Sequence, residues 1–179
     1  MNTCIALVRG INVGKAKRIA MGDLRSIVAD LGHGNVRTLL NSGNVVFECG
    51  RKNPAGTAQG IRTAIAVRTG ISAQVVVVTA KELATVIQEN PFPEAAGEPS
   101  RFLVAFVTDP CELERIAPLT KTSWIPDQLA LGSHAAYMWC VGGILESKVL
   151  ASVMKAMGEN VTTRNWATVV KLHAMASAG

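Results

Sequence analysis

Residues 36–47, VRTLLNSGNVVF, decide the fold. Residues 36–40 and 44–47 are rich in aliphatic and β-branched side chains, which favour strands. Asn41-Ser42-Gly43 between them is a typical turn sequence, because Asn and Gly accept the backbone angles that tight turns require. The stretch therefore predicts a β-hairpin.

The segments on both sides of this hairpin place it within a ferredoxin-like half. Upstream, residues 3–8 (TCIALV) predict a buried strand, and an apolar repeat at helical spacing over residues 24–31 ends at Gly32. Downstream, Asn53-Pro54 begins a predicted helix, and residues 72–78 (SAQVVVV) predict another strand. The order β-α-β-β-α-β is the ferredoxin-like pattern.

The second half of the chain repeats much of this order. The expected elements are a helix at 83–87, a strand at 102–107, a helix from Asp109, strands at 129–131 and 136–140, and a helix at 149–157. Thr163 is then expected to cap a last helix, which stands where the fourth strand of the repeat would be. The sequence thus predicts an α+β protein of two ferredoxin-like halves, residues 1–79 and 80–179, the second half being a variant of the first.

Composition limits the classes of protein to which the chain can belong. Of 179 residues, 49% are hydrophobic and 17% charged, so a substantial core is expected and disorder is not. The formal net charge of +5 favours anionic partners. No apolar run approaches the ~20 residues of a membrane helix. Residues 1–8 lack the basic start of a signal peptide, and Arg9 ends their apolar run, so a cytoplasmic location is expected.

The four cysteines are far apart in the sequence. Cys4, Cys49, Cys111 and Cys140 form no CxxC pair and no zinc-ligand spacing. Each lies in or beside an apolar run, which predicts buried, reduced thiols. Neither a metal site nor a cofactor is expected.

The ferredoxin-like connectivity indicates where a ligand could bind. Strand one lies antiparallel to strand three, so the loop after strand one should meet the hairpin turn before strand three. Glycine backbones in these loops allow close approach of a ligand and can form an anion-binding nest. The candidate ligand-binding residues here are Arg9, Gly10, Asn12, Gly14, Lys15, Asn41, Ser42 and Asn44. The alternative is that the glycines and asparagines only shape tight turns.

Three further motifs are weaker. Gly10-x-x-x-Gly14-Lys15 is one residue shorter than a phosphate-binding P-loop and has Ala16 where Ser or Thr is required. Arg164 and Asn165 form a second candidate site, since Arg164 is expected at a helix N-terminus, which favours anions. Ser147-Lys148 is a third, and Ser147 is most simply a helix cap.

Several of these stretches resemble a known family. They are residues 7–14 (LVRGINVG), 41–47 (NSGNVVF), 90–93 (NPFP), 147–148 (SK) and 163–166 (TRNW). Together they resemble, in order and over nearly the whole chain, the bacterial domain-of-unknown-function family number sixteen ninety-seven. The resemblance implies a two-subdomain α+β fold and a bacterial cytoplasmic protein, but no activity. The chain departs from the family pattern at Lys15 and Ala167, beside the candidate sites.

Three functions remain open at this stage. The first is a binding protein or an enzyme that takes a small anionic or phosphorylated ligand. Its catalytic residues stay unknown, and Ser42 is the one plausible nucleophile in the loops. The second is a nucleic-acid-binding protein that uses a basic loop surface. Base stacking is disfavoured because strand one has no aromatic residue and strand three only Phe47, which leaves a backbone contact through Lys15, Lys17 and Arg18. The third is a non-catalytic protein-interaction module. The oligomeric state is left open.

Overall fold

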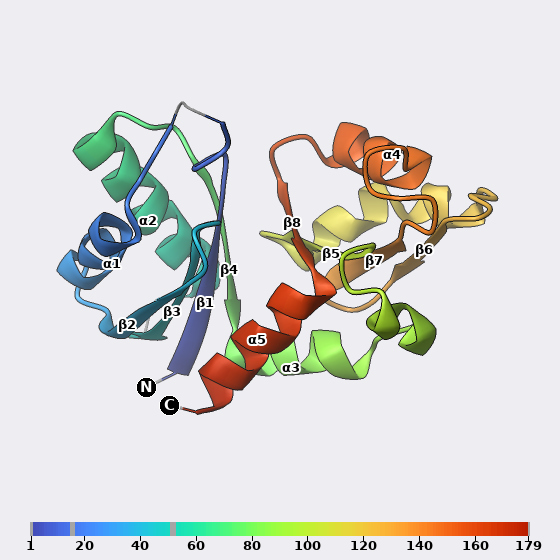
Figure 1. Cartoon of the computed structure of the whole chain (residues 1–179). Helices are drawn as coiled ribbons and strands as arrows, with labels where there is room; N and C mark the ends of the chain where they lie inside the picture. The colour runs from blue at the N-terminus through green and yellow to red at the C-terminus, as the bar shows by residue number, and fades with distance from the viewer. Residues whose placement is uncertain (1, 15–16, 51–52, 179) are drawn as a thin grey trace. The chain divides into compact units, whose positions relative to one another are not determined.

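The structure is a computed structural model that describes residues 2–14, 17–50 and 53–178 (Figure 1). The chain forms two compact units. One comprises Met1–Lys81 together with Leu172–Gly179, and the other comprises Glu82–Lys171. No helix among the described residues is both long enough and apolar enough to cross a membrane.

The first unit has the expected ferredoxin-like order. Its elements are β1 (Asn2–Arg9), α1 (Met21–Asp30), β2 (Gly34–Leu39), β3 (Asn44–Cys49), α2 (Pro54–Thr69) and β4 (Gln74–Thr79). The strands form an antiparallel sheet in the order β2-β3-β1-β4. The predicted hairpin is β2 and β3, joined by the turn that contains Asn41.

The core of the first unit follows from the periodicity of its elements. Cys4, Ala6 and Val8 alternate along β1 and pack in one cluster with apolar residues of α1 and α2. Ile5 and Leu7 between them are also buried, so both faces of β1 are covered. Apolar side chains are therefore continuous along the strand, which is why residues 3–8 show no alternation in sequence.

The second unit carries a similar sheet. Its strands are β5 (Phe102–Val107), β6 (Gln128–Leu131), β7 (Ala135–Trp139) and β8 (Val161–Asn165), in the order β6-β7-β5-β8. Helix α4 (Lys148–Met157) packs on one face with the short 3-10 helices η2 (Pro110–Arg115) and η3 (Ala117–Lys121). The remaining elements are α3 (Ala80–Gln88), η1 (Pro93–Gly97) and α5 (Trp166–Ser177).

The expectation that the second half lacks its fourth strand is wrong. β8 pairs with β5 over its whole length, from Leu103 opposite Asn165 to Val107 opposite Val161. Three of its five residues are β-branched or aliphatic, and they fit a pleated, half-buried surface. Thr163 therefore lies within a strand, and Asn165 is the residue that caps α5, accepting a hydrogen bond from the Thr168 N–H at 2.9 Å.

The helix expected after β5 is replaced by η2 and η3. Asp109, from which that helix was expected to begin, caps η2 and accepts a hydrogen bond from the Cys111 N–H at 2.9 Å. Pro118 follows shortly and has no N–H to continue an α-helical ladder. The segment therefore forms two short turns of 3-10 helix.

The prediction of four buried, reduced cysteines is also wrong. A disulfide joins Cys4 of β1 to Cys49 of β3, with Cα atoms 5.9 Å apart. Cys4 lies diagonally across from Cys49, because Cys49 faces Asn2 and Cys4 faces Phe47. Of the two free cysteines, Cys140 is buried and Cys111 is exposed. Two cysteines on adjacent strands, 45 residues apart in sequence, give no spacing signal that could have been recognised.

Candidate functional site

The loop after β1 and the turn before β3 meet, which confirms the connectivity argument. The Asn12 side-chain amide donates a hydrogen bond to the Asn41 carbonyl at 2.9 Å. The Val8 N–H donates to the Gly43 carbonyl at 2.8 Å. These bonds hold the two loops at one end of the sheet.

Asn12 organises the loop that follows β1. Its amide also donates to the Ile19 carbonyl at 3.0 Å, and its side-chain oxygen accepts from the Ile19 N–H at 2.9 Å. The Asn12 backbone N–H donates to the Lys17 carbonyl at 3.0 Å, and Asn12 has a positive φ of 56°. Asn tolerates this left-handed conformation better than most residues. The Asn12 side chain thus forms its hydrogen bonds within the protein.

A pocket of about 550 Å³ opens beside these contacts. It is lined by Asn12, Gly14, Arg18, Ile19, Ala20, Met21 and Asn41. The volume falls within the range of small-molecule sites. The pocket therefore joins the loop after β1, the hairpin turn and the start of α1.

The start of α1, where Ala20 and Met21 line the pocket, has unused backbone donors. Ala20 occupies the N-cap position and has no side chain that can cap the helix. The first helical bond is from the Leu24 N–H to the Ala20 carbonyl. Consequently the N–H groups of Met21 and Gly22 have no acceptor among the described residues. The N-terminus of a helix in this state attracts anions.

Among the described residues that line the pocket, Arg18 is the cation. Its side chain is exposed, and its guanidinium has a long contact of 3.4 Å with the Gly14 carbonyl. No carboxylate within the described part of the chain forms an ion pair with it. Asp23 in the first turn of α1 is exposed but does not line the pocket.

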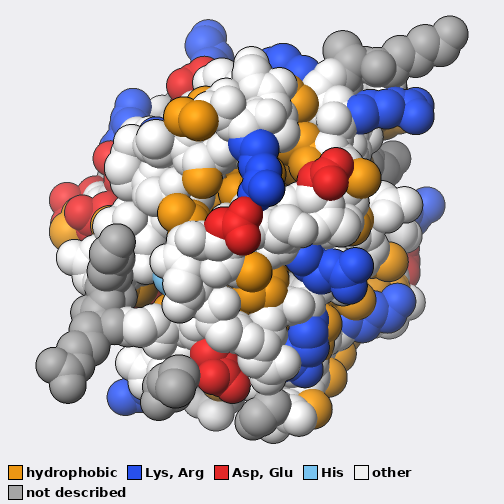
Figure 2. Space-filling view, turned by 90° about the vertical axis from the view of Figure 1, so that its left-hand side faces the viewer, with side chains coloured by type: hydrophobic (Ala, Val, Ile, Leu, Met, Phe, Trp, Pro, Cys, Tyr) orange, Lys and Arg blue, Asp and Glu red, His pale blue; other side chains and the backbone are white. Residues whose placement is uncertain are grey.

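Charge is divided unevenly between the two units. The first unit has eleven Lys and Arg and three Asp and Glu, a formal +8, whereas the second has seven and ten, a formal −3. Figure 2 shows one face of the molecule, on which Lys and Arg side chains are spread among Asp and Glu side chains and several lie along one edge. The pocket therefore lies in the electropositive unit.

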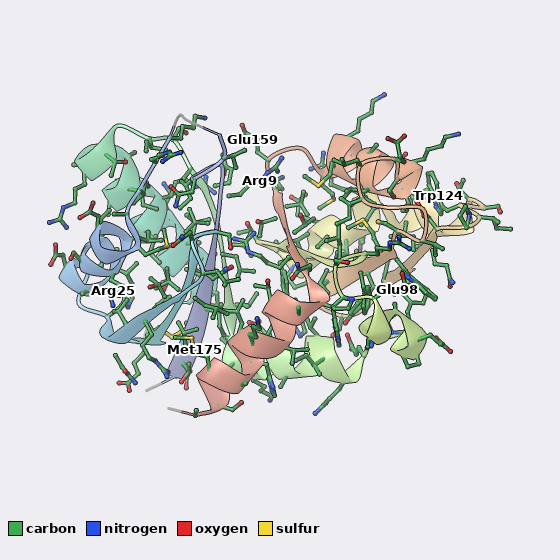
Figure 3. The ribbon with its side chains drawn as sticks, in the orientation of Figure 1. Arg9, Arg25, Glu98, Trp124, Glu159 and Met175 are labelled. Carbon is green, nitrogen blue, oxygen red and sulfur yellow. A yellow bond between two sulfur atoms is a disulfide. The ribbon has the colours of Figure 1, made fainter. Side chains whose placement is uncertain are left out.

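The structure brings only some of the predicted residues into the pocket. Asn12, Gly14 and Asn41 line it. Arg9 does not, because it ends β1 opposite Gln74 of β4 (Figure 3). Gly10 follows with a φ of 83° and makes the turn. Lys15 lies outside the described residues.

Ser42 and Asn44 support the hairpin. Asn44 is fully buried. Its side-chain amide donates to the Leu39 carbonyl at 3.0 Å and to the Ser42 hydroxyl at 2.9 Å. Neither residue lines the pocket.

The expectation that Arg164 lies at a helix N-terminus is wrong, because Arg164 belongs to β8. Its guanidinium donates to the Thr162 hydroxyl at 2.9 Å and to the Thr163 carbonyl at 2.8 Å. Burial lowers the pKa of Arg164 to about 10, which still leaves it charged at neutral pH. Asn165 caps α5 through its side chain. Both side chains have contacts within the fold.

The candidate ligand-binding residues predicted from the sequence did not include Arg18, Ala20 or Met21. A signal was present in residues 17–22, KRIAMG, where two basic residues precede a helix with no Ser, Thr, Asp or Asn at its first position. Among the described residues, no group of three His, Cys, Asp or Glu side chains is arranged to hold a metal ion.

Comparison with known proteins places the chain in a family. The chain is similar in structure to the conserved bacterial protein SP0830 from Streptococcus pneumoniae, with a TM-score of 0.79, 21% identity and 98% of each chain covered. This likeness shows a shared fold. No curated protein matches the sequence. The model of the family "Protein of unknown function (DUF1697)" matches residues 1–137, and the chain belongs to that family.

Proposed function

We propose that the pocket beside α1 binds a small ligand that carries a phosphate or carboxylate group. The supporting observation is Arg18, which lines the pocket without a carboxylate partner among the described residues, next to an uncapped helix N-terminus. A guanidinium matches the geometry of both anions and binds them through two parallel hydrogen bonds. The +8 charge of the first unit raises the local concentration of anions.

Each lining group has a role in this proposal. Arg18 pairs with the anion, the N–H groups of Met21 and Gly22 donate to its oxygens, and the exposed Asn41 side chain orients the rest of the ligand. Asn12 acts indirectly by fixing the loop. Lys15 remains a predicted second cation.

The proposal is for binding. Ser42, the candidate nucleophile, accepts a hydrogen bond from the Asn44 amide and lies outside the pocket lining. The His33 ring packs against Phe47 with ring centroids 4.7 Å apart. The described lining residues therefore contain no pair of a nucleophile and a base.

A nucleic-acid backbone is the second candidate ligand, and the +8 charge of the first unit favours it. Phe47 is buried and so cannot stack on a base. Contact would then be limited to phosphates, and retention on immobilised RNA or DNA would fall steeply with salt.

The test compares two arginines of the same unit. Binding of inorganic phosphate, glucose 6-phosphate and citrate is measured by calorimetry and by the shift of the melting temperature. Arg18→Gln should lower the affinity of the tightest of these ligands by about tenfold or more, since charge-assisted bonds are involved. Arg25→Gln removes the same charge from an exposed position of α1 outside the pocket lining and should leave the affinity unchanged.

Equal losses in Arg18→Gln and Arg25→Gln would contradict a specific site. Salt-sensitive retention on nucleic acid without binding of any small anion would favour the second candidate. If neither is seen, a protein-interaction role gains support.

We also propose a cytoplasmic location. The exposed free thiol of Cys111 supports it, because free surface thiols persist where reductants are present. In that compartment Cys4 and Cys49 would be reduced. Lysis of cells directly into denaturant with excess alkylating reagent should then modify all four cysteines, and protection of Cys4 and Cys49 until reductant is added would contradict the location.

A further inference from the structure

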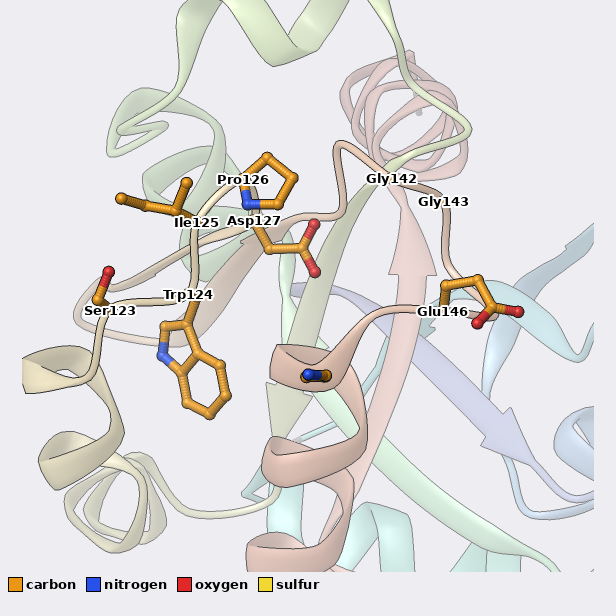
Figure 4. A pocket seen from close by; sticks show the side chains of 9 residues that line it. Ser123, Trp124, Ile125, Pro126, Asp127, Gly142, Gly143 and Glu146 are labelled. Carbon is orange, nitrogen blue, oxygen red and sulfur yellow. The ribbon is translucent and has the colours of Figure 1, made fainter.

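The second unit contains a pocket that the proposed function does not use. Its volume is about 450 Å³, and its wall includes Trp124, Asp127, Glu146 and Lys148. Figure 4 shows Trp124 and Asp127 on one loop, with Glu146 on the segment that leads into α4. Gly142 and Gly143 also line it, and a Cβ at either position would meet nothing within 4 Å. Space beside the glycine backbone is therefore open.

The aromatic wall of this pocket is fixed in place. The Trp124 indole N–H donates to the Leu119 carbonyl at 2.8 Å, and part of the side chain packs against the apolar core. The half-exposed ring is thus held with its polar edge already bonded within the protein. The face of an indole carries negative electrostatic potential and attracts cations more strongly than that of other aromatic residues.

The carboxylate beside it is fixed as well. One oxygen of Asp127 accepts a hydrogen bond from the Ser147 hydroxyl at 2.7 Å. The hydroxyl in turn accepts from the Leu150 N–H at 3.2 Å, at the first turn of α4. The other oxygen of Asp127 has no donor among the described residues, so it is open to a ligand in the pocket that Asp127 lines.

The charges of the pocket wall favour a positively charged ligand. Asp127 and Glu146 supply two negative charges, whereas Lys148 supplies one positive charge. Lys148 is exposed and carries its charge on a flexible stem, so it can extend into solvent. The second unit as a whole has a formal charge of −3.

We propose that this pocket binds a small organic amine in its ammonium form. The ammonium group lies against the Trp124 ring and donates to the open oxygen of Asp127. Glu146 adds a second, longer-range attraction. An aromatic face beside carboxylates is the combination that recognises ammonium groups. The site is separate from the anion pocket and does not depend on it.

The test uses three probes of nearly the same shape. They are 2-phenylethylamine, 2-phenylethanol and 3-phenylpropionate, which carry a positive, zero and negative charge. Titrations are followed by the indole N–H resonance of Trp124 in ¹⁵N-labelled protein, assigned with Trp124→Phe. The amine should shift this resonance and bind about tenfold more tightly than the alcohol, and the acid should bind more weakly still.

Variants identify the groups responsible. Asp127→Asn should reduce amine affinity about tenfold, while its amide oxygen still accepts from Ser147 and keeps the cap of α4. Glu146→Gln, at an exposed position, should reduce affinity without affecting folding. Lys148→Ala should increase affinity, because it removes a like charge.

Several results would overturn the proposal. They are equal binding of the three probes, tighter binding of the acid, weaker amine binding in Lys148→Ala, unchanged binding in both Asp127→Asn and Glu146→Gln, or no shift at millimolar amine.

Discussion

At the scale of single residues, the loop after β1 depends on Asn12. Its side chain makes three hydrogen bonds, two donated to carbonyls of Ile19 and Asn41 and one accepted from the Ile19 N–H. Asn12→Asp keeps the acceptor but turns a carboxylate oxygen toward the two carbonyls. We expect a loss of about 2–3 kcal/mol in the free energy of unfolding, measured with urea.

Asn12→Gly is the matched variant, because Gly adopts the φ of 56° without strain but lacks the side chain. It should lose less stability than Asn12→Asp. If Asn12→Asp is as stable as the unchanged protein, the loop does not depend on the amide.

Substitution of Gly43 by Ala tests how closely the hairpin turn approaches β1. Its φ is 77°, and a Cβ there would lie 2.9 Å from the Val8 carbonyl oxygen. Gly43→Ala should therefore lower the free energy of unfolding by about 2–4 kcal/mol. Gly14→Ala is the control, since Gly14 has a φ of 65° but open space around it, and it should lose about 1 kcal/mol. Equal losses would mean that the close approach adds nothing to the cost of the backbone angle.

The sequence could predict that the two loops meet, because that follows from antiparallel pairing. It could not predict which side chains remain available. Asn12 and Asn44 are used in local hydrogen bonds that depend on exact loop geometry. Arg18 replaces Arg9 in the pocket because residue 9 still belongs to β1.

At the scale of elements, α4 begins at Ser147, a helix cap whose hydroxyl also contacts the carboxylate of Asp127. The Ser147 hydroxyl accepts from the Leu150 N–H and donates to Asp127. Ser147→Ala should cost about 1–2 kcal/mol in the free energy of unfolding. Ser147→Asp, ordinarily a good cap, should cost more, because its carboxylate would face that of Asp127. Thermal and urea unfolding measure both variants, and greater stability of Ser147→Asp than Ser147→Ala would contradict this arrangement.

The elements of the first unit could be predicted well because their signals are independent. A turn sequence, two helix ends and three apolar runs all agree on one order. β8 was missed because Thr163 and Asn165 are both residues that commonly cap helices, and only pairing with β5 decides between strand and cap. Long-range pairing of this kind leaves no local signal.

At the scale of the whole molecule, the disulfide and the two free thiols give the protein a defined thiol count. The described residues include all four cysteines, with Cys4 and Cys49 bonded, Cys111 exposed and Cys140 buried. A chromogenic disulfide reagent should therefore detect one thiol in the purified oxidised native protein, two after denaturation without reductant, and four after reduction. Closing a loop of 45 residues should stabilise the fold by about 4 kcal/mol at most, so reduction should lower the urea midpoint.

The rate at which the first thiol reacts should depend strongly on pH. A hydrogen bond with Asp109 and the negative charge of that carboxylate raise the pKa of the Cys111 thiol above its ordinary value of 9.0, so little thiolate is present at neutral pH. The reaction should accelerate as pH rises through and beyond 9, and Asp109→Asn should shift that increase to lower pH.

Burial likewise raises the pKa of the Cys140 thiol. Above pH 9 the unfolded chain would lose this proton while the folded chain keeps it, so Cys140 should reduce stability as pH rises there. Two fast-reacting thiols in the native protein would contradict the burial of Cys140, and four would contradict the disulfide.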